Sequence, residues 1–182
     1  YANPWLSTQM INTINAIKDS LLLKVRPIAV PQCAYVHLIQ IRNNLPEEIA
    51  AIAYFANDNP AQSPRLPIYA AILQTPEPFH LSGHKHFTPH AAAWIYRQAN
   101  KLATIRWQES RIKLEKLRNQ FEDTLFTQQP QIDAQALHLL KTQGKQALQQ
   151  YLTDYLRDFS NETLDAWTKL RDELWYTLIR GL

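Results

Sequence analysis

The sequence has very little glycine and cysteine. Its three glycines are Gly83, Gly144 and Gly181, so a glycine-rich loop that cradles phosphate groups is excluded. The single cysteine, Cys33, cannot form an internal disulfide, which fits a reducing compartment. These two scarcities remove nucleotide-binding loops and disulfide scaffolds from the classes of protein to consider.

Long apolar runs and an excess of one charge are also missing. No apolar run approaches the ~20 residues that cross a bilayer, so we expect no membrane segment. The net charge of +3, from 19 basic and 16 acidic residues, points to neither a nucleic-acid nor a membrane partner. No basic region followed by an apolar core stands at the start. We therefore expect a cytoplasmic protein, unless a signal peptide lies upstream.

The clearest strand in the sequence is 34–42, AYVHLIQIR. Its alternate residues form two faces, one with Tyr35, His37, Ile39 and Ile41 and the other with Val36, Leu38, Gln40 and Arg42. Because both faces carry apolar side chains, a sheet built on this strand needs cover on both sides. Nothing else in the chain offers two full layers of cover. We expect part of that cover to lie in absent sequence, leaving a large apolar patch on the sheet.

Two further apolar runs, 49–56 and 66–73, follow the first strand after short links. The second link, 57–64, is rich in turn formers and neither link can hold a helix, so the pattern predicts an antiparallel meander over about 34–73. Pro67 places the start of the third strand at an edge or bulge.

Helical patterns occupy the rest of the chain. An amphipathic helix is predicted over 6–23, before the strands. After them, Thr88-Pro89 predicts a helix start, with a phase slip over 106–113 and an end before Pro130. Three more helices are predicted: 133–143, which Gly144 stops, one that carries Leu148 to Phe159, and a last one that starts near Ser160 or Asn161.

This order of elements predicts an α+β fold, a strand meander followed by a helical block. The expected organisation is a single domain over 1–182, or the carboxyl-terminal portion of a larger domain. Within it, 1–87 holds the amino-terminal helix and the strands, and 88–182 is a helical tail.

Two groups of residues could carry thiol or metal chemistry. The first is the histidine group His80, His84, His86 and His90. Its spacing would suit zinc in a folded loop, but no HExxH pattern, cysteine or carboxylate completes it, so a solvated loop is favoured. The second is Cys33, whose nearest imidazole, His37, is ~13 Å away along a strand. An inert cysteine is favoured there over a nucleophile.

Two other features have plainer interpretations. Ser63 lacks a GxSxG elbow, so a turn-capping role is favoured. Acidic residues interrupt the basic residues of the long helix, which favours a solvated face over a nucleic-acid surface; the basic residues are Arg97, Lys101, Arg106, Arg111, Lys113, Lys116 and Arg118. From the residues alone, the sequence predicts no catalytic constellation, no cofactor and no metal site.

A series of short segments nevertheless resembles a known family. RPIAV at 26–30 leads into VHLIQIRNNLPEEIAAIAYFA, then SPRLPIYAAI and TPEPF, and then a helix with Ala92, Trp94, Arg97, Asn100 and Leu102. In this order and spacing, the segments resemble the carboxyl-terminal half of the cysteine-type dipeptidases of peptidase family sixty-nine. The resemblance covers about 26–120 and weakens thereafter.

The resemblance implies an N-terminal-nucleophile hydrolase with a four-layer αββα sandwich. In that family an exposed amino-terminal cysteine attacks the peptide carbonyl, with its own α-amine as base. Neither Tyr1 nor Cys33 matches the nucleophile's context, so no catalytic residue is carried over to this chain. Arg26 is a weak candidate for binding the substrate carboxylate, with a structural salt bridge as the alternative.

The resemblance thus predicts the carboxyl-terminal part of a dipeptidase, inactive alone. Its expected partners are the amino-terminal half of the same enzyme and, in the complete enzyme, a dipeptide substrate; a homo-oligomer is also conceivable. The alternative hypothesis is a non-catalytic α+β module that binds a partner protein through its apolar surface.

Overall fold

The computed structural model describes residues 8–22, 28–30 and 32–181. Three strands form one antiparallel sheet in the order β1-β2-β3: β1 is Tyr35–Ile41, β2 is Ala51–Asn57 and β3 is Leu66–Tyr69. A single helical turn, α2 (Glu47–Ala50), leads into β2. The predicted meander is confirmed, and Pro67 lies in an edge strand as expected.

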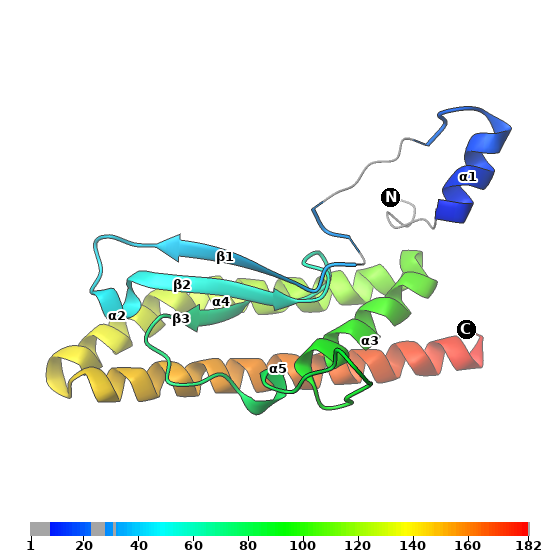
Figure 1. Cartoon of the computed structure of the whole chain (residues 1–182). Helices are drawn as coiled ribbons and strands as arrows, with labels where there is room; N and C mark the ends of the chain where they lie inside the picture. Colours follow the sequence, from blue (N-terminus) through cyan, green and yellow to red (C-terminus); the bar gives the residue numbers. More distant parts are fainter. Residues whose placement is uncertain (1–7, 23–27, 31, 182) are drawn as a thin grey trace.

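The helices form a layer beneath one face of this sheet (Figure 1). They are α3 (Ala92–Ile105), α4 (Trp107–Thr142) and α5 (Lys145–Arg180). α4 and α5 are long and antiparallel, and α3 crosses beside them. A short 3-10 turn, η1 (Glu77–Phe79), lies in the connection between β3 and α3. The molecule is therefore an α+β structure, as the sequence predicts.

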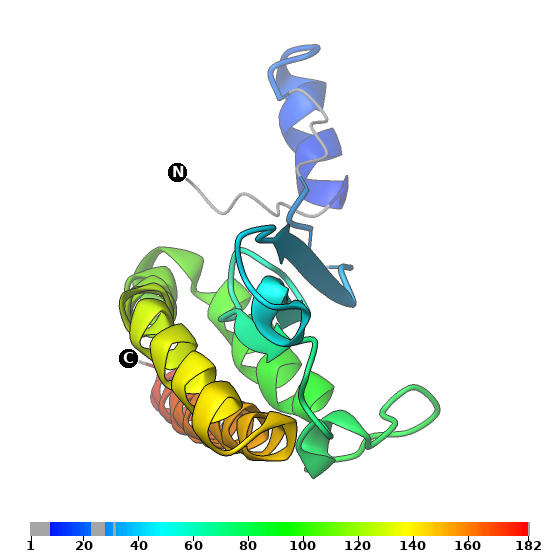
Figure 2. The same cartoon turned by 90° about the vertical axis from the view of Figure 1, so that its left-hand side faces the viewer.

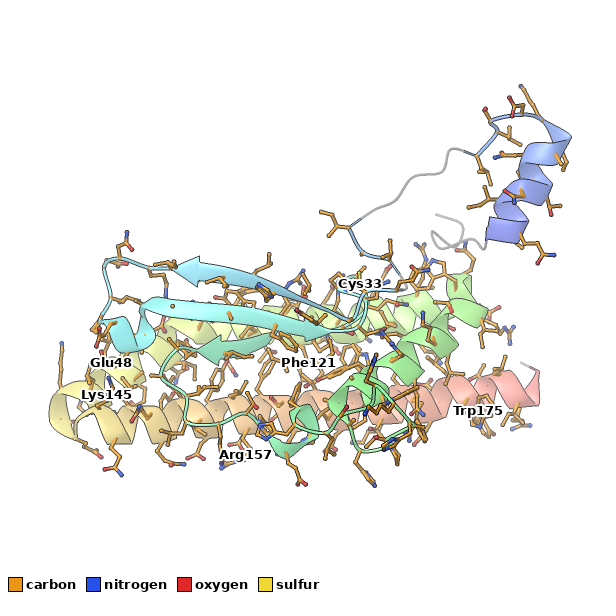
Figure 3. The ribbon with its side chains drawn as sticks, viewed as in Figure 1. Cys33, Glu48, Phe121, Lys145, Arg157 and Trp175 are labelled. Atoms are coloured by element: carbon orange, nitrogen blue, oxygen red, sulfur yellow. The ribbon has the colours of Figure 1, made fainter. Side chains whose placement is uncertain are left out.

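The core lies between the sheet and the helices. On β2, Ile52, Tyr54 and Ala56 point toward the helices and are buried. Phe121 of α4 packs against both buried clusters, its ring 5.8 Å from that of Phe159 and 6.1 Å from that of Trp167 (Figure 3). Apolar burial between the two layers is the main stabilising contribution to this fold.

The opposite face of the sheet has no such cover among the described residues. Tyr35, Ile39 and Ile41 of β1 are 58%, 63% and 71% exposed. Figure 2 shows β1 as the part of the sheet that stands farthest from the helices. We call this surface, formed by the odd-numbered residues of β1 and β2, the open face.

The amino-terminal helix is shorter than predicted. α1 spans Thr8–Ile17, and the chain then turns because Asn15 accepts from the Leu22 backbone N–H (2.8 Å) and donates to the Leu22 carbonyl (3.0 Å). The predicted ends of this helix, Leu6 and Leu23, lie outside the described residues.

The start and the middle of the helical block also differ from the prediction. The first helix begins at Ala92 with no side-chain cap, and Thr88 instead donates to the Ser82 carbonyl (2.9 Å). The predicted phase slip is a full break at Arg106 (φ −121°, ψ 58°), which separates α3 from α4. Because the helix is interrupted at Arg106, α3 and α4 can each turn an apolar stripe toward the core.

Two predicted helix ends do not exist. α4 continues through Pro130 to Thr142, because this proline is exposed and water can bond the carbonyl that loses its N–H. Likewise α5 is one helix through Ser160, where two were predicted. Its buried residues recur at helical spacing on both sides of Ser160, and the break at Gly144 (φ 87°) is the predicted one.

Candidate functional site: a buried polar centre after β2

The loop after β2, residues 58–63, is polar in sequence and largely buried in the structure. Asp58, Asn59, Gln62 and Ser63 are each at most 2% exposed. Buried polar groups destabilise a protein unless they are hydrogen-bonded. The sequence predicts a simple turn here, whereas the burial of these side chains requires a network of hydrogen-bonding partners.

Asp58 begins the loop in an unusual backbone conformation. Its φ is +60°, the left-handed region that asparagine and aspartate tolerate best among residues with a side chain. Its N–H donates to the Ala34 carbonyl over 2.8 Å, which ties the loop to the start of β1. Strained residues of this kind persist where surrounding contacts hold them, often at functional sites.

Helix α3 supplies the partners of this carboxylate. Arg97 Nε donates to Asp58 Oδ1 over 2.7 Å, and Asn100 Nδ2 donates to Asp58 Oδ2 over 3.0 Å. The same Asn100 amide donates to Ser63 Oγ (2.8 Å), and its oxygen accepts from Trp167 Nε1 (3.2 Å). Three separate segments therefore meet at Asn100. We call Asp58, Ser63, Arg97, Asn100 and Trp167 the polar centre.

The polar centre also reaches the chain just before β1. Arg97 donates from its second terminal nitrogen to the Cys33 carbonyl over 3.0 Å. One guanidinium thus holds both the strand start and the loop, in the fork geometry that arginine offers. Figure 3 shows Cys33 at this end of the sheet.

Two buried amides beside the polar centre lack an acceptor within the described part of the chain. These are the Nδ2 groups of Asn57 and Asn59, although Asn59 Oδ1 accepts from the Ala61 N–H (2.9 Å). A buried donor without a partner costs about 1–3 kcal/mol, and native proteins keep few of them. At this end of the sheet, two buried amide groups can therefore still donate hydrogen bonds.

The open face begins directly beside the polar centre. Asn57 lies opposite Tyr35 in the β1–β2 register. Tyr35 stacks on Phe55 (centroids 5.7 Å apart) and on His37 (6.1 Å). A row of aromatic rings thus runs along the open face from the polar centre, a surface suited to apolar or aromatic groups.

A second network fastens the other end of the sheet to α4. Arg42 pairs with Asp133, and Asp133 also accepts from the Tyr69 hydroxyl (2.9 Å). Burial first, and then the neighbouring Asp133 carboxylate, raise the pKa of Tyr69 well above its ordinary value. A phenol kept protonated in this way serves as a hydrogen-bond donor and is no base at neutral pH.

The structure does not assemble the thiol chemistry considered from sequence. The Cys33 thiol lies 3.5 Å from the Ile28 carbonyl, while His37 stacks on Tyr35. No hydrogen bond joins these two residues in the parts of the chain that are described, so Cys33 has no base there. Arg26, the weak substrate-binding candidate, lies outside the described residues.

The remaining candidates from the sequence are the histidine group, Ser63 and the basic residues of the long helix. His80 shares a hydrogen bond with Thr75 (2.6 Å), and no cluster of three or more metal-ligating side chains occurs among residues 8–22, 28–30 and 32–181. Ser63 is a buried acceptor in the polar centre. Of the basic helix residues, Arg97, Arg106 and Lys113 each pair with a carboxylate.

The sequence did not predict the residues that make most of the hydrogen bonds in the polar centre. Asn100 entered only as a letter of the family resemblance, Arg97 entered there and among the basic residues of the long helix, and Asp58 and Trp167 were not singled out. An asparagine-aspartate run directly after an apolar strand was the available signal. The partner of this run on α3, Asn100, lies 42 residues further along the chain, and Trp167 of α5, which donates to Asn100, lies 67 residues beyond that, so neither could be read from sequence.

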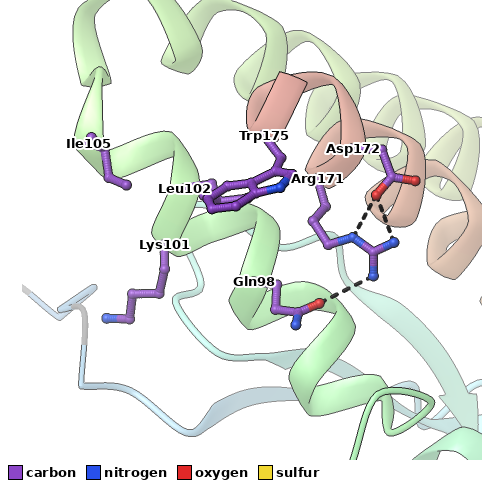
Figure 4. Close-up of a pocket in the computed structure, with 7 residues that line it drawn as sticks. All are labelled: Gln98, Lys101, Leu102, Ile105, Arg171, Asp172 and Trp175. Carbon is purple, nitrogen blue, oxygen red and sulfur yellow. Dashed lines mark hydrogen bonds and ion pairs between the residues drawn. The ribbon is translucent and has the colours of Figure 1, made fainter. Parts of the chain in front are cut away.

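A cavity of about 510 Å³ lies elsewhere, between α3 and α5 (Figure 4). Its walls include Leu102, Ile105 and Trp175, and Arg171 at its rim is already bonded to Gln98 (3.2 Å) and Asp172 (2.7 Å). No nucleophile–base pair lines it. It lies in the helical layer and is not the surface that the polar centre borders.

A family model described as Peptidase family C69 matches residues 9–120. The match spans α1, the whole sheet, α3 and the first part of α4. It therefore includes the polar centre except Trp167. No curated protein matches the chain. Among the described helices, none is long and apolar enough to span a membrane.

Proposed function

Because the chain belongs to Peptidase family C69, which matches more than half of it, we propose that it is part of an enzyme that hydrolyses dipeptides. The proposed nucleophile is an amino-terminal cysteine outside these residues. Its thiol adds to the peptide carbonyl carbon while its own α-amine takes the thiol proton. The C–N bond then breaks, the leaving amine receives that proton, and water hydrolyses the thioester.

The observation that carries this proposal is the pairing of an open face with a buried polar centre. The helices cover one face of the sheet, and the other face leaves Tyr35, Ile39 and Ile41 exposed. A second sheet packed there, with a helical layer of its own on its far side, would complete an αββα sandwich. It would bring the nucleophile to the end of the sheet that Asp58, Arg97 and Asn100 organise.

Cys33 is not the proposed nucleophile. Its thiol is directed to a backbone carbonyl, and no imidazole or amine within the described residues is bonded to it. A cysteine needs a base or a positively charged neighbour to become a reactive thiolate. The Arg97 guanidinium contacts only the carbonyl of this residue.

The test uses the natural gene product. Its mass and amino-terminal residue are measured, and hydrolysis of a panel of dipeptides is followed before and after alkylation with iodoacetamide. We expect a longer protein with an amino-terminal cysteine, whose activity is abolished by alkylation. The Cys33→Ser variant is the matched control and should keep full activity. Loss of activity in that variant, or no dipeptide hydrolysis by the natural product, contradicts the proposal.

A second candidate function rests on the exposed side chains of β1. Leu38, Ile39 and Ile41 are all more than half exposed, which is typical of a protein-binding surface. On this hypothesis the chain is a non-catalytic module that binds a partner protein. A natural gene product that starts near Tyr1, hydrolyses no dipeptide and forms a stable complex would favour it.

A further inference from the structure

The two edges of the sheet differ in how they are protected. Edge strands of soluble proteins avoid pairing with other chains through short length, proline, charge or bulges. β3 follows this rule, with four residues and Pro67. β1 has seven residues, and 34–41 contains no proline, no glycine and no formally charged residue.

The backbone bonds show which groups point outward at each edge. The Ala34 carbonyl accepts from the Asp58 N–H, and the Arg42 N–H donates to the Ala50 carbonyl. The backbone N–H and C=O groups of the even-numbered residues of β1 therefore point toward β2. In an antiparallel pair the residues between them turn both N–H and C=O the other way. The outward groups of β1 are therefore those of four residues: Tyr35, His37, Ile39 and Ile41.

The same reasoning explains the protection of β3. The Ala70 N–H donates to the Ala51 carbonyl, so the backbone groups of the even-numbered residues of β3 point toward β2. Pro67 is odd-numbered, and its backbone groups therefore point to the free edge. A proline there removes a donor from the free edge and breaks no bond to β2. No comparable device occurs on β1, whose outward N–H groups are all intact.

The side chains of β1, like its backbone groups, indicate a strand that has a neighbour on each side. Leu38 on the helix-facing side and Ile39 on the open face are 53% and 63% exposed. A strand that is apolar on both faces is typical of the interior of a sheet, with a neighbour on each side. The described helix that precedes β1, α1, also lies on the side of β1 away from the helical layer (Figures 1 and 2).

From these observations we infer that β1 is an interior strand in the working protein. Its outward edge pairs with a β-strand from a segment of the same enzyme outside these 182 residues. The identity of that segment rests on the proposed function, whereas the pairing rests only on the edge chemistry. The added strand has apolar side chains on both faces, to cover Leu38 and Ile39.

Hydrogen exchange in the natural gene product tests the pairing without any assay of activity. We expect the amides of His37, Ile39 and Ile41 to exchange at least about 100-fold more slowly than unstructured amides. Exchange of all three at the unstructured rate overturns the inference, and so does a gene product that consists of these 182 residues alone. Protection that appears only as the protein dimerises would assign the edge to a second copy and overturn the proposed occupant.

Two variants at position 39 separate the stabilising contribution of the backbone N–H from that of the side chain. Ile39→Pro removes an outward N–H that makes no bond to β2, and Ile39→Ala keeps it. We expect Ile39→Pro to lower the unfolding midpoint of the natural gene product well beyond Ile39→Ala. Equal midpoints would show that this N–H has no partner. If the amides are protected but no dipeptide is hydrolysed, the proposed function fails and the pairing stands.

Discussion

Arg97 and Asp58 form an ion pair, with Arg97 Nε 2.7 Å from Asp58 Oδ1. Their side chains are 39% and 2% exposed, so the carboxylate is buried and the guanidinium reaches water. The pair joins α3 to a left-handed residue in the loop after β2. It therefore holds the polar centre against the start of β1, and several predictions concern it and its surroundings.

Removing the guanidinium should destabilise the protein. Arg97→Ala leaves the Asp58 carboxylate buried with Asn100 as its remaining side-chain donor, and we expect a loss of about 2 kcal/mol in the free energy of unfolding. Urea unfolding followed by circular dichroism measures it. Arg106→Ala, which breaks a surface pair with Glu109, should cost under about 1 kcal/mol. Equal losses in both variants would contradict a buried structural role for Arg97.

Asn100 should tolerate substitution less than any exposed residue of α3. Its side chain donates to Asp58 and Ser63 and accepts from Trp167. Asn100→Leu removes the side-chain partner of Trp167 Nε1 and one donor each from Ser63 and Asp58, so we expect a loss of about 3 kcal/mol or more. Differential scanning calorimetry of Asn100→Leu beside Lys101→Ala gives the comparison. A change in melting temperature no larger than that of Lys101→Ala would refute the network.

Two tyrosines near Asp133 should respond in opposite ways to loss of the hydroxyl. Tyr69 donates to Asp133 over 2.9 Å, and we expect Tyr69→Phe to cost about 1–2 kcal/mol. The Tyr155 hydroxyl is buried with no partner among the described residues. Tyr155→Phe should therefore be neutral or slightly stabilising. Chemical denaturation of the two variants side by side checks the difference in sign.

Stability should fall at alkaline pH. Burial raises the pKa of Tyr69, Tyr96 and Tyr155 above the ordinary value of 10.0. A raised folded-state pKa means that the folded state holds its proton longer than the unfolded state. The stabilising contribution is complete below about pH 10 and is lost as pH rises further. Urea midpoints at pH 8 and pH 11 measure it, and Tyr69→Phe should make the decline shallower.

The proline inside α4 should be replaceable with a gain in stability. Pro130 lies inside α4 and is exposed. Pro130→Ala restores a helical N–H, and we expect a gain of about 2 kcal/mol. In the turn between α4 and α5, Gly144→Ala should cost about 1–3 kcal/mol, because its φ is +87° and a residue with a side chain is strained in that conformation. Thermal unfolding of both variants tests the opposite signs.

Much of the fold follows from local patterns in the sequence. The two-residue period of β1, the turn formers after β2 and the stop at Gly144 predicted the meander and the boundary between α4 and α5 correctly. The ends predicted at Pro130 and Ser160 were wrong. Local propensity favours a break at both residues, but packing of the flanking apolar stripes against the sheet and the partner helix outweighs it.

The apolar character of β1 on both faces was visible in the sequence, and so was the family resemblance over its central part. Residue chemistry alone determines these features, because a strand's faces follow from alternation. The polar centre is different: Asp58, Asn100 and Trp167 are far apart in the chain, and only the packing of α3 and α5 beneath the sheet brings them within hydrogen-bonding distance. Which face of the sheet is covered was likewise decided by tertiary structure, because it depends on where the helices pack, and the strand order made β1 an edge.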